Sequence, residues 1–344
     1  MKGAALVSHG GPESLVWRED LPEPAPAPGE VVVQVSACGI NHLDIWIRKG
    51  LKGVVLPLPH VLGADVCGTV ASVGAGVSSP KAGDRVLVNP GLPCGTCARC
   101  AAGRESECPQ FGILGLKRWG GYAERVVVPA ANCLSWPEGM AAPLAAAVPL
   151  VFTTAHHMLH ARGQLKAGET VLVLAASSGV GTAAVQLAKA AGARVLAVVG
   201  SEDKAFRVLG LDADRALVRT AEDFVAAALR ETEGRGVDLI VDPVGGEVLA
   251  KALGALDRGG RLVTCAVTAG PAATLDLRTL YMRHLSVLGA YMGSRHELEA
   301  ALALLASGRV KPVVDTVFPM REAAEAHRRL EEGRHFGKLV LTAT

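Results

Sequence analysis

Four cysteines within one short segment form the densest group of metal-ligating side chains in the sequence. The segment PCGTCARCAAGRESECPQ has the spacing C-x2-C-x2-C-x7-C and contains Cys94, Cys97, Cys100 and Cys108. Four thiolates on one loop close a tetrahedral zinc site and leave no open coordination position for a substrate. The first two spacings also occur in iron–sulfur proteins, but the long last gap argues against a cluster. We therefore predict one structural zinc ion per chain.

A second group of candidate ligands lies in CGINHLD (38–44), where a cysteine, an asparagine and a histidine stand close together. An amide oxygen is a poor zinc ligand beside thiolate or imidazole, so we predict no metal at Asn41. A displaced second metal site has no spacing template to support it. The residues available for such a site would be Cys38, His42, His60, Asp65 and Cys67.

A turn of small residues separates an apolar strand from an amphipathic helix in VLVLAASSGVGTAAVQLAK. Such a turn lets the backbone approach a pyrophosphate, and the first N–H groups of the helix point at the phosphates. A tight strand-to-helix turn also tolerates small residues for packing alone, but the alternating strand and helix context favours a dinucleotide site. The candidate cofactor-binding residues in this turn are Ser177, Ser178, Gly179, Val180 and Gly181.

The segment ARVLAVVGSEDK bears on the choice between NADP(H) and NAD(H). An acidic residue at the end of this strand would bind the ribose 2′-hydroxyl of NAD, but the chain has Gly200 and Ser201 there, followed by Lys204. Small residues leave room for a 2′-phosphate and the lysine can pair with it, so we predict NADP(H). Glu202 and Asp203 keep NAD(H) open as an alternative. Two further candidates for cofactor contact are Val244 and Ala266.

These residues must be positioned by two different kinds of domain. The first third is rich in short Val-rich strands bounded by Gly and Pro, whereas from about residue 153 apolar strands alternate with helices. Continuous apolar strands separated by helices predict an α/β fold with a doubly wound parallel sheet covered on both faces.

The composition limits the classes of partner. The chain has 344 residues, a formal net charge of +2 and 50% hydrophobic residues, which is typical of a two-domain soluble enzyme. Such a small charge gives no support for nucleic acid or an anionic membrane as partner. No apolar run reaches the length of a membrane span, and the N-terminus lacks a signal-peptide pattern, so we expect a cytoplasmic protein.

The whole chain resembles the medium-chain dehydrogenase/reductase superfamily, which includes the zinc alcohol dehydrogenases and the quinone reductases. The motifs that carry the resemblance are CGINHLD, PLPHVLGADVCGTVASVGAGV, KAGDRVLV, the four-cysteine lobe, GGYAERVVVP, AAAVPLVFTTAHHML, the nucleotide turn and GRHFGKLVL. The resemblance implies a Rossmann dinucleotide-binding domain at 151–289. It also implies a GroES-like catalytic domain of twisted β-barrel type at 1–150 plus 290–344, with the zinc lobe at about 90–110.

This chain departs from the zinc alcohol dehydrogenases at every position of their catalytic metal. Asn41 stands where that branch has its first cysteine ligand, Ala64 where it has histidine, and Leu150 at or next to the third ligand. Leu43 replaces the Ser or Thr that relays the alcohol proton. The asparagine resembles the quinone reductase branch, which generally lacks the cysteine lobe.

The resemblance implies an oxidoreductase that moves hydride from NAD(P)H to a quinone, an enone or another small carbonyl compound. Asn41 would polarise the substrate carbonyl, Asp44 and Trp46 would shape the pocket, and Asp65 completes the candidate catalytic set. One alternative is an alcohol dehydrogenase that acts on small alcohols or aldehydes. Another is a dinucleotide-binding protein that acts on RNA or a partner, as some relatives do, although the near-neutral charge weighs against it.

Three more residues are candidates for cofactor contact through the resemblance. His42 would contact the pyrophosphate or cap the local turn, Thr154 would contact the nicotinamide or serve as a helix N-cap, and Lys338 would bind the phosphates. The segment LSVLGAYMG looks like a strand able to pair with its mate across a two-fold axis. We therefore expect a homodimer or a homotetramer.

Overall fold

The structure is a computed structural model that describes residues 1–343, and its contacts divide the chain into two compact units. The first unit contains Met1–Leu150, Ser294–His296 and the chain from Pro312 onward, and the second contains Val151–Gly293 and Glu297–Lys311. The expected domain boundaries share the break after residue 150 but place residues 290–293 and 297–311 with the first domain. Those boundaries remain a prediction.

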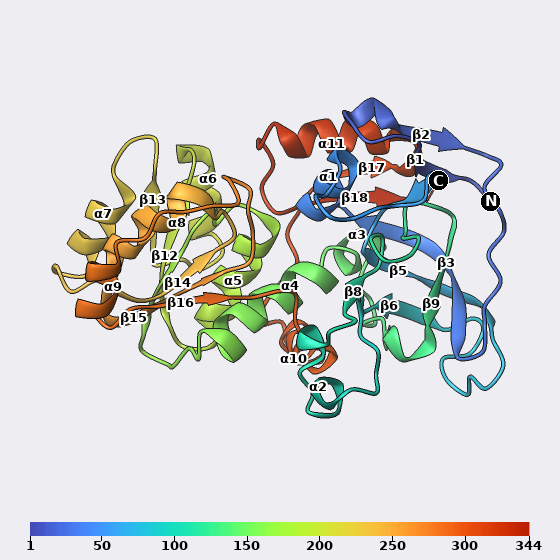
Figure 1. The fold of residues 1–344 in the computed structure, drawn as a ribbon, viewed down its shortest axis with the longest axis horizontal. Helices are drawn as coiled ribbons and strands as arrows, with labels where there is room; N and C mark the ends of the chain where they lie inside the picture. Colours follow the sequence, from blue (N-terminus) through green and yellow to red (C-terminus); the bar gives the residue numbers. More distant parts are fainter. Residues whose placement is uncertain (344) are drawn as a thin grey trace. The chain divides into compact units, whose positions relative to one another are not determined.

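The first unit is built on β-sheets (Figure 1). The largest has the strand order β10-β6-β5-β3-β18-β17, with β9 also paired to β3. Its strands are β3 (Glu30–Gly39), β5 (Asp65–Val73), β6 (Arg85–Val88), β9 (Arg125–Pro129), β10 (Cys133–Ser135), β17 (Val314–Pro319) and β18 (Lys338–Thr342). The smaller sheets contain β1 (Gly3–Leu6), β2 (Leu15–Arg18) and β4 (His60–Val61), and β7 (Gly91–Leu92) with β8 (Gly112–Ile113). Among the described residues these sheets do not close into one barrel, although the β-rich character expected of this domain is confirmed.

Short helices connect the strands of the first unit. They are η1 (Pro12–Ser14), α1 (His42–Lys49), α2 (Ala98–Ala101), η2 (Glu105–Glu107), η3 (Ala130–Asn132), α3 (Ala142–Ala145), η6 (Met320–Glu322) and α11 (Ala323–Glu331). Strand β3 ends within the segment CGINHLD, and helix α1 begins two residues after Ile40. Asn41 is extended and caps the helix, because its backbone N–H donates to the Asp44 carboxylate at 2.8 Å. The helix buries Ile45 and Ile47 in the core and stops at Gly50, which has a φ of 94°.

The second unit contains the predicted doubly wound sheet of six parallel strands in the order β13-β12-β11-β14-β15-β16. The strands are β11 (Thr170–Val173), β12 (Arg194–Val199), β13 (Arg215–Val218), β14 (Val237–Asp242), β15 (Leu256–Thr264) and β16 (Ser286–Gly289). The order reverses beside β11, and ligands of such sheets bind at that switch point, at the carboxyl ends of the strands. Strand β13 was not predicted, since only Leu217 and Val218 of its four residues are buried.

Helices join these strands in the second unit. They are α4 (Pro149–His156), the π-helix η4 (His157–Arg162), α5 (Gly179–Ala190), α6 (Glu202–Leu209), α7 (Phe224–Glu231), α8 (Gly246–Ala252), η5 (Leu253–Ala255), α9 (Leu277–Met282) and α10 (Arg295–Ala306). The helical stretch 142–162 is long and apolar enough to span a membrane, contrary to the sequence expectation. Because 72% of its apolar window is buried inside the protein, this stretch is weak evidence for a span.

Candidate functional site

The side-chain amide of Asn41 is held in one orientation by two buried charged groups. Its Oδ1 accepts a hydrogen bond from Lys338 Nζ at 2.7 Å, and its Nδ2 donates to Asp65 Oδ2 at 2.9 Å. Only the amide oxygen can accept from an ammonium group and only the NH2 can donate to a carboxylate, so these partners determine which atom faces which. The second N–H of Nδ2 has no hydrogen-bond partner among residues 1–343.

Asp65 is the fully buried acceptor at the centre of this cluster. Its Oδ2 accepts from Lys338 Nζ at 2.8 Å and from Asn41, and its Oδ1 accepts from the backbone N–H of Leu150 at 2.6 Å. A buried carboxylate is tolerated when a cation and several N–H groups compensate it, as they do here. We call Asn41, Asp65 and Lys338 the buried polar triad.

Lys338 has different partners from those predicted. Strand β18 pairs antiparallel with β3, with Val340 opposite Gly39, and this register brings the lysine beside the end of β3. The ammonium donates to Ile40 O at 2.7 Å, to Asn41 and to Asp65, so all three of its N–H groups are used. In this structure the side chain is buried and its N–H groups are all engaged, and the predicted contact between Lys338 and the cofactor phosphates remains a prediction.

Asp44 holds the backbone at Asn41 and at Gly63 in place through two hydrogen bonds. Its Oδ2 accepts from the backbone N–H of Asn41, and its Oδ1 accepts from the backbone N–H of Gly63 at 3.1 Å. Burial raises the pKa of Asp44 to about 6, although these two N–H groups and the Lys338 charge act in the opposite direction. The carboxylate thus holds α1 against the segment that leads to Asp65.

Two aromatic side chains follow Asn41 along α1. The ring of His42 lies 6.4 Å from the ring of Trp46 and 6.3 Å from that of His335, measured between centroids. Burial, followed by the nearby Lys338 charge, lowers the pKa of His42, so its imidazole is neutral at pH 7. Trp46 is half-buried one helical turn after His42.

The other candidate metal ligands are used elsewhere. Cys67 Sγ donates to Ala142 O at 3.3 Å, and His60 Nε2 lies 3.0 Å from Gly115 O. Burial raises the pKa of Cys67 to about 12 and that of Cys38 well above its ordinary value, which disfavours the thiolate form that binds metal. Between Met1 and Ala343, the four-cysteine lobe is the only group of three or more such side chains spaced to hold an ion.

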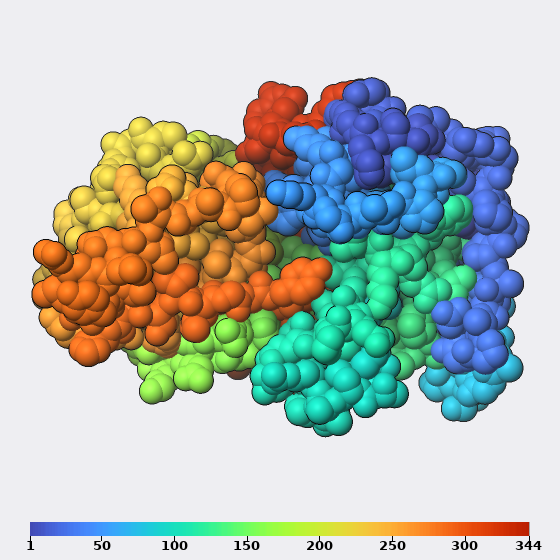
Figure 2. Space-filling view, viewed as in Figure 1, coloured from blue at the N-terminus to red at the C-terminus, as the bar shows by residue number. Residues whose placement is uncertain are grey.

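The cysteine lobe lies at the surface of the first unit around α2 (Figures 1 and 2). All four Sγ atoms lie within 4.8 Å of one another, with Cys94 to Cys100 at 3.9 Å and Cys97 to Cys100 at 3.5 Å. A tetrahedron with Zn–S bonds of ~2.3 Å has S···S edges of roughly 3.8 Å, so these side chains fit a zinc ion. Backbone N–H groups of Thr96 and Cys97 lower the pKa of Cys94 to about 6, which favours the thiolate ligand.

In the predicted dinucleotide-binding turn, the start of helix α5 packs tightly against the end of strand β11. A Cβ at Gly181 would lie 2.3 Å from Ala175 O, so only glycine lets α5 approach the end of β11 this closely. Ser178 caps the helix, since its Oγ accepts from Gly181 N at 3.0 Å. Ala175 has a φ of 44°, a conformation usually reserved for glycine, which marks a strained turn. Ser177, Gly179 and Val180 form the rest of this turn and the start of α5.

The remaining predicted cofactor residues of the second unit lie at the same edge of the sheet. Gly200 and Ser201 follow β12, and Ser201 Oγ caps α6 by accepting from Lys204 N at 3.4 Å. Val244 and Ala266 follow β14 and β15, and a Cβ at Gly245 would lie 2.4 Å from Ala266 O. Because carboxyl ends of parallel strands share one edge, the structure brings these positions to the side of the sheet where the α5 turn lies.

Arg219 is a candidate cofactor residue that the sequence analysis missed. It follows β13, its backbone N–H donates to Val199 O at 3.0 Å, and its guanidinium lies 3.8 Å from the position of a Cβ on Gly200. Thr220 Oγ1 also donates to Gly200 O at 3.3 Å. Arg219 could have been found only by recognising strand β13, because the carboxyl end of that strand brings Arg219 beside Gly200.

Thr154 lies inside helix α4 and is buried, so its alternative role as an N-cap is wrong. Its hydroxyl donates to Met292 Sδ at 3.9 Å. His157, the first residue of η4, has its Nδ1 3.0 Å from Glu297 Oε1, a buried contact between η4 and α10. The predicted contact between Thr154 and the nicotinamide remains a prediction.

Two family models match the chain. Residues 27–138 match the alcohol dehydrogenase GroES-like domain, and residues 211–341 match the zinc-binding dehydrogenase domain.

Whole-length relatives have several activities. Human quinone oxidoreductase is 29% identical over 99% of this chain and 97% of its own, and acryloyl-coenzyme A reductase of Metallosphaera sedula is 32% identical over 98% and 99%. A solved structure titled NAD-dependent alcohol dehydrogenase is 44% identical, with a TM-score of 0.96 over the full length of both chains.

Proposed function

The chain belongs to the medium-chain dehydrogenase/reductase superfamily and is an NAD(P)-dependent oxidoreductase, and from this premise we propose that it reduces a carbon–carbon double bond conjugated to a carbonyl group. The observation that supports this substrate class is the oriented amide of Asn41, which presents one unused N–H beside a buried cation. Such a donor suits an oxygen that gains negative charge during the reaction.

The electron flow of the proposed reaction is simple. When bound, the reduced dinucleotide supplies a hydride, which carries two electrons, to the β-carbon of the substrate. The double-bond electrons move toward the carbonyl, whose oxygen becomes an enolate oxygen. A proton from water then adds at the α-carbon, and the products are the saturated carbonyl compound and the oxidised dinucleotide. A quinone takes the same hydride and one proton: the enolate oxygen is protonated, and a proton then moves from the ring carbon that received the hydride to the second carbonyl oxygen, which gives the hydroquinone.

The buried polar triad supports a reaction that needs no catalytic metal. Lys338 withdraws electron density from the Asn41 oxygen, which makes the amide N–H a stronger donor, and Asp65 keeps the NH2 from rotating. A zinc alcohol dehydrogenase would stabilise the oxygen with a metal held by three protein ligands. Here Ala64 offers no donor atom, and the ammonium of Lys338 is the cation nearest Asn41.

We further propose NADP(H) as the preferred dinucleotide and one structural zinc ion per chain. Gly200 leaves space for a 2′-phosphate, the Arg219 guanidinium lies 3.8 Å from the position of a Cβ on Gly200, and Lys204 lies in the first turn of α6. Zinc would be held by the four cysteine thiolates, where it would hold the lobe in shape. The residues that support dinucleotide binding are those of the α5 turn.

The assembly we propose is a homodimer or homotetramer. Strand β16 is an edge strand of the six-stranded sheet, and Leu277, Tyr281 and Met282 on α9 are exposed apolar side chains. Light scattering that gave a monomer mass at micromolar concentration would overturn this.

A panel of substrates tests the proposed activity. The purified chain should oxidise NADPH with enones, enoyl thioesters or quinones faster than with saturated ketones or aldehydes. A second candidate, oxidation of a small alcohol, is favoured by the name of the 44% identical structure. Turnover of primary or secondary alcohols, with no turnover of any conjugated carbonyl compound, would replace our proposal with that activity.

A further inference from the structure

Residues 294–296 form a short crossover segment, in which the chain leaves the second unit and then returns to it. Val151–Gly293 and Glu297–Lys311 belong to the second unit by their contacts, whereas Ser294–His296 belong to the first. Arg295 is the first residue of α10, so its backbone N–H is one of the four at the helix start that have no acceptor within the helix. The acceptor that it uses lies in the cysteine lobe.

Glu105, which stands between Cys100 and Cys108 in the lobe, provides this acceptor. Its Oε2 accepts from the backbone N–H of Arg295 at 2.6 Å, and its negative charge is favourable at the positive end of the α10 dipole. The backbone oxygen of Glu105 accepts from the N–H of Cys108 at 3.0 Å. The residue that caps α10 is therefore itself attached to the last of the four predicted zinc ligands.

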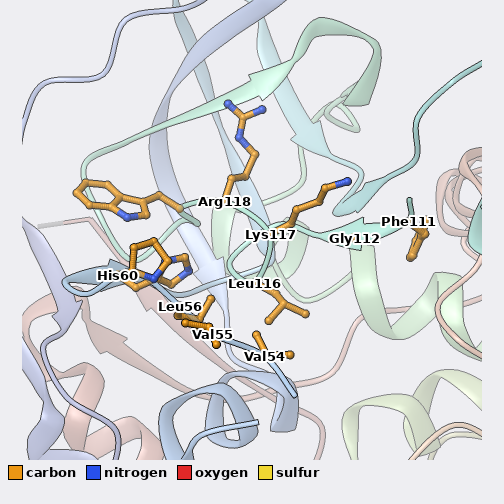
Figure 3. A pocket seen from close by; sticks show the side chains of 11 residues that line it. Val54, Val55, Leu56, His60, Phe111, Gly112, Leu116, Lys117 and Arg118 are labelled. Carbon is orange, nitrogen blue, oxygen red and sulfur yellow. The ribbon is translucent and has the colours of Figure 1, made fainter. Parts of the chain in front are cut away.

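The side chain of Arg295 is tied to the other end of the lobe. Its guanidinium donates to the carbonyl oxygen of Ala131 in η3. The next residue, Asn132, donates through its buried Nδ2 to Gly91 O at 2.6 Å, and Gly91 belongs to β7, after which the lobe begins. The lobe ends at β8, which pairs with β7, and Figure 3 shows Gly112 of this strand in the wall of a hollow of the first unit. Arg295 thus needs both ends of the lobe to be in place at once.

The residues on either side of the crossover segment are attached within the second unit to the stretch that contains Thr154. Met292 is buried, and its sulfur accepts from Thr154 Oγ1 at 3.9 Å. Its φ of 55° is unusual for a residue with a side chain, so the surrounding contacts must hold it in this conformation. On the other side, Glu297 Oε1 lies 3.0 Å from His157 Nδ1. Thr154 is the residue predicted to contact the nicotinamide.

We infer that the cysteine lobe, once zinc is bound, anchors the crossover segment through Glu105 and Ala131 and thereby helps to position Thr154 for the dinucleotide. This inference rests on the proposed zinc site and the proposed dinucleotide site. Four thiolates bonded to one ion keep the two ends of the lobe together. Without the ion the lobe gains conformational freedom, and both hydrogen bonds of Arg295 weaken.

Hydrogen exchange of the peptide that contains Arg295, together with fluorescence titration of the reduced dinucleotide, tests this anchor. Removal of zinc by a chelator should speed exchange of the Arg295 amide at least about tenfold, because its charged acceptor is lost. The dissociation constant of the dinucleotide should rise at least about fivefold, while kcat at saturating dinucleotide is retained.

Variants separate the anchor from a general loss of structure in the lobe. Glu105→Ala keeps all four cysteines, so it should retain its zinc and still show faster exchange and weaker dinucleotide binding. Glu105→Gln keeps a neutral acceptor and should lie between Glu105→Ala and the native protein. Asp84→Ala is the matched control, because this exposed carboxylate also accepts from a backbone N–H, that of Lys81 at 2.7 Å, but lies outside the lobe. It should change neither measurement.

The outcomes distinguish this inference from the proposals on which it rests. If elemental analysis finds no zinc in the native protein, the proposed zinc site fails, and the zinc dependence of the anchor fails with it. If zinc is present but exchange at Arg295 is the same after chelation and in Glu105→Ala, the anchor is overturned and the zinc site stands. Faster exchange with an unchanged dissociation constant for the dinucleotide overturns the effect on Thr154.

Discussion

The ammonium nitrogen of Lys338 lies 2.7 Å from the amide oxygen of Asn41, although almost three hundred residues separate them in the sequence. The pairing of β18 with β3 creates this contact and also brings the lysine within 2.8 Å of Asp65. A buried cation thus lies beside Asn41, the residue that stands where zinc alcohol dehydrogenases have a metal-binding cysteine. In the mechanism that we propose, this charge acts on the substrate through the Asn41 amide.

Removal of the Lys338 charge should destabilise the fold, because it leaves Asp65 as an unpaired buried carboxylate. We expect Lys338→Met to lower the free energy of unfolding by about 3–5 kcal/mol, measured by urea denaturation. The double variant Lys338→Met/Asp65→Asn should recover more than half of that loss. The partly exposed pair of Lys189 with Asp214 provides the control, and Lys189→Met should cost about 1 kcal/mol or less. A loss below about 1 kcal/mol for Lys338→Met would argue against the pairing.

The free energy of unfolding should depend on pH through the titration of the buried Asp44. Its folded-state pKa of about 6 is above its ordinary value of 3.8, so between these pH values the folded state binds more protons than the unfolded state. Stability from this group is therefore present below pH 4 and is lost as the pH rises to 6, about 3 kcal/mol in total.

In Asp44→Asn this loss should disappear, so the variant's stability relative to the native protein should rise between pH 4 and 6. Denaturation curves at several pH values measure it, with the exposed Asp212→Asn as control. If the difference in unfolding free energy between Asp44→Asn and the native protein stays the same from pH 4 to 6, Asp44 titrates normally in the folded chain.

The cysteine lobe should account for all of the bound zinc. Elemental analysis is expected to give one zinc per chain, and Cys97→Ser should lower thermal stability much more than it changes the turnover of protein that stays folded. Cys133→Ser, outside the lobe, is the matched control and should keep the zinc. A second stoichiometric zinc that a mild chelator removes together with activity would assign a catalytic metal and contradict the proposed mechanism.

Dinucleotide preference should depend on the cations around Gly200. NADPH is expected to bind more tightly than NADH in fluorescence titrations. Arg219→Ala and Lys204→Ala should each reduce the difference in binding free energy between the two dinucleotides by about 1–3 kcal/mol. Neither substitution should change the affinity for NADH, since that dinucleotide lacks the 2′-phosphate. Equal affinity for both dinucleotides in the native protein would refute the preference.

The sequence predicted those features that depend on local chain geometry. The spacing of the four cysteines, the turn at Gly181 and the alternation of strands and helices each depend on neighbouring residues, and the structure contains all three. The partners of Lys338 were not predicted, because they depend on the pairing of two distant strands. Arg219 was missed because β13 is short and half-exposed, so its carboxyl end was not recognised as part of the nucleotide edge.

The most direct test of the account is the steady-state turnover of Asn41→Leu with the best conjugated carbonyl substrate of the native protein. Leucine has nearly the shape of asparagine, leaves the Lys338–Asp65 pair intact and removes the N–H donor. The account predicts a fall in kcat of about 10²–10³ with folding and dinucleotide affinity retained. A kcat within about threefold of the native value would contradict the central claim that this amide stabilises the reacting oxygen.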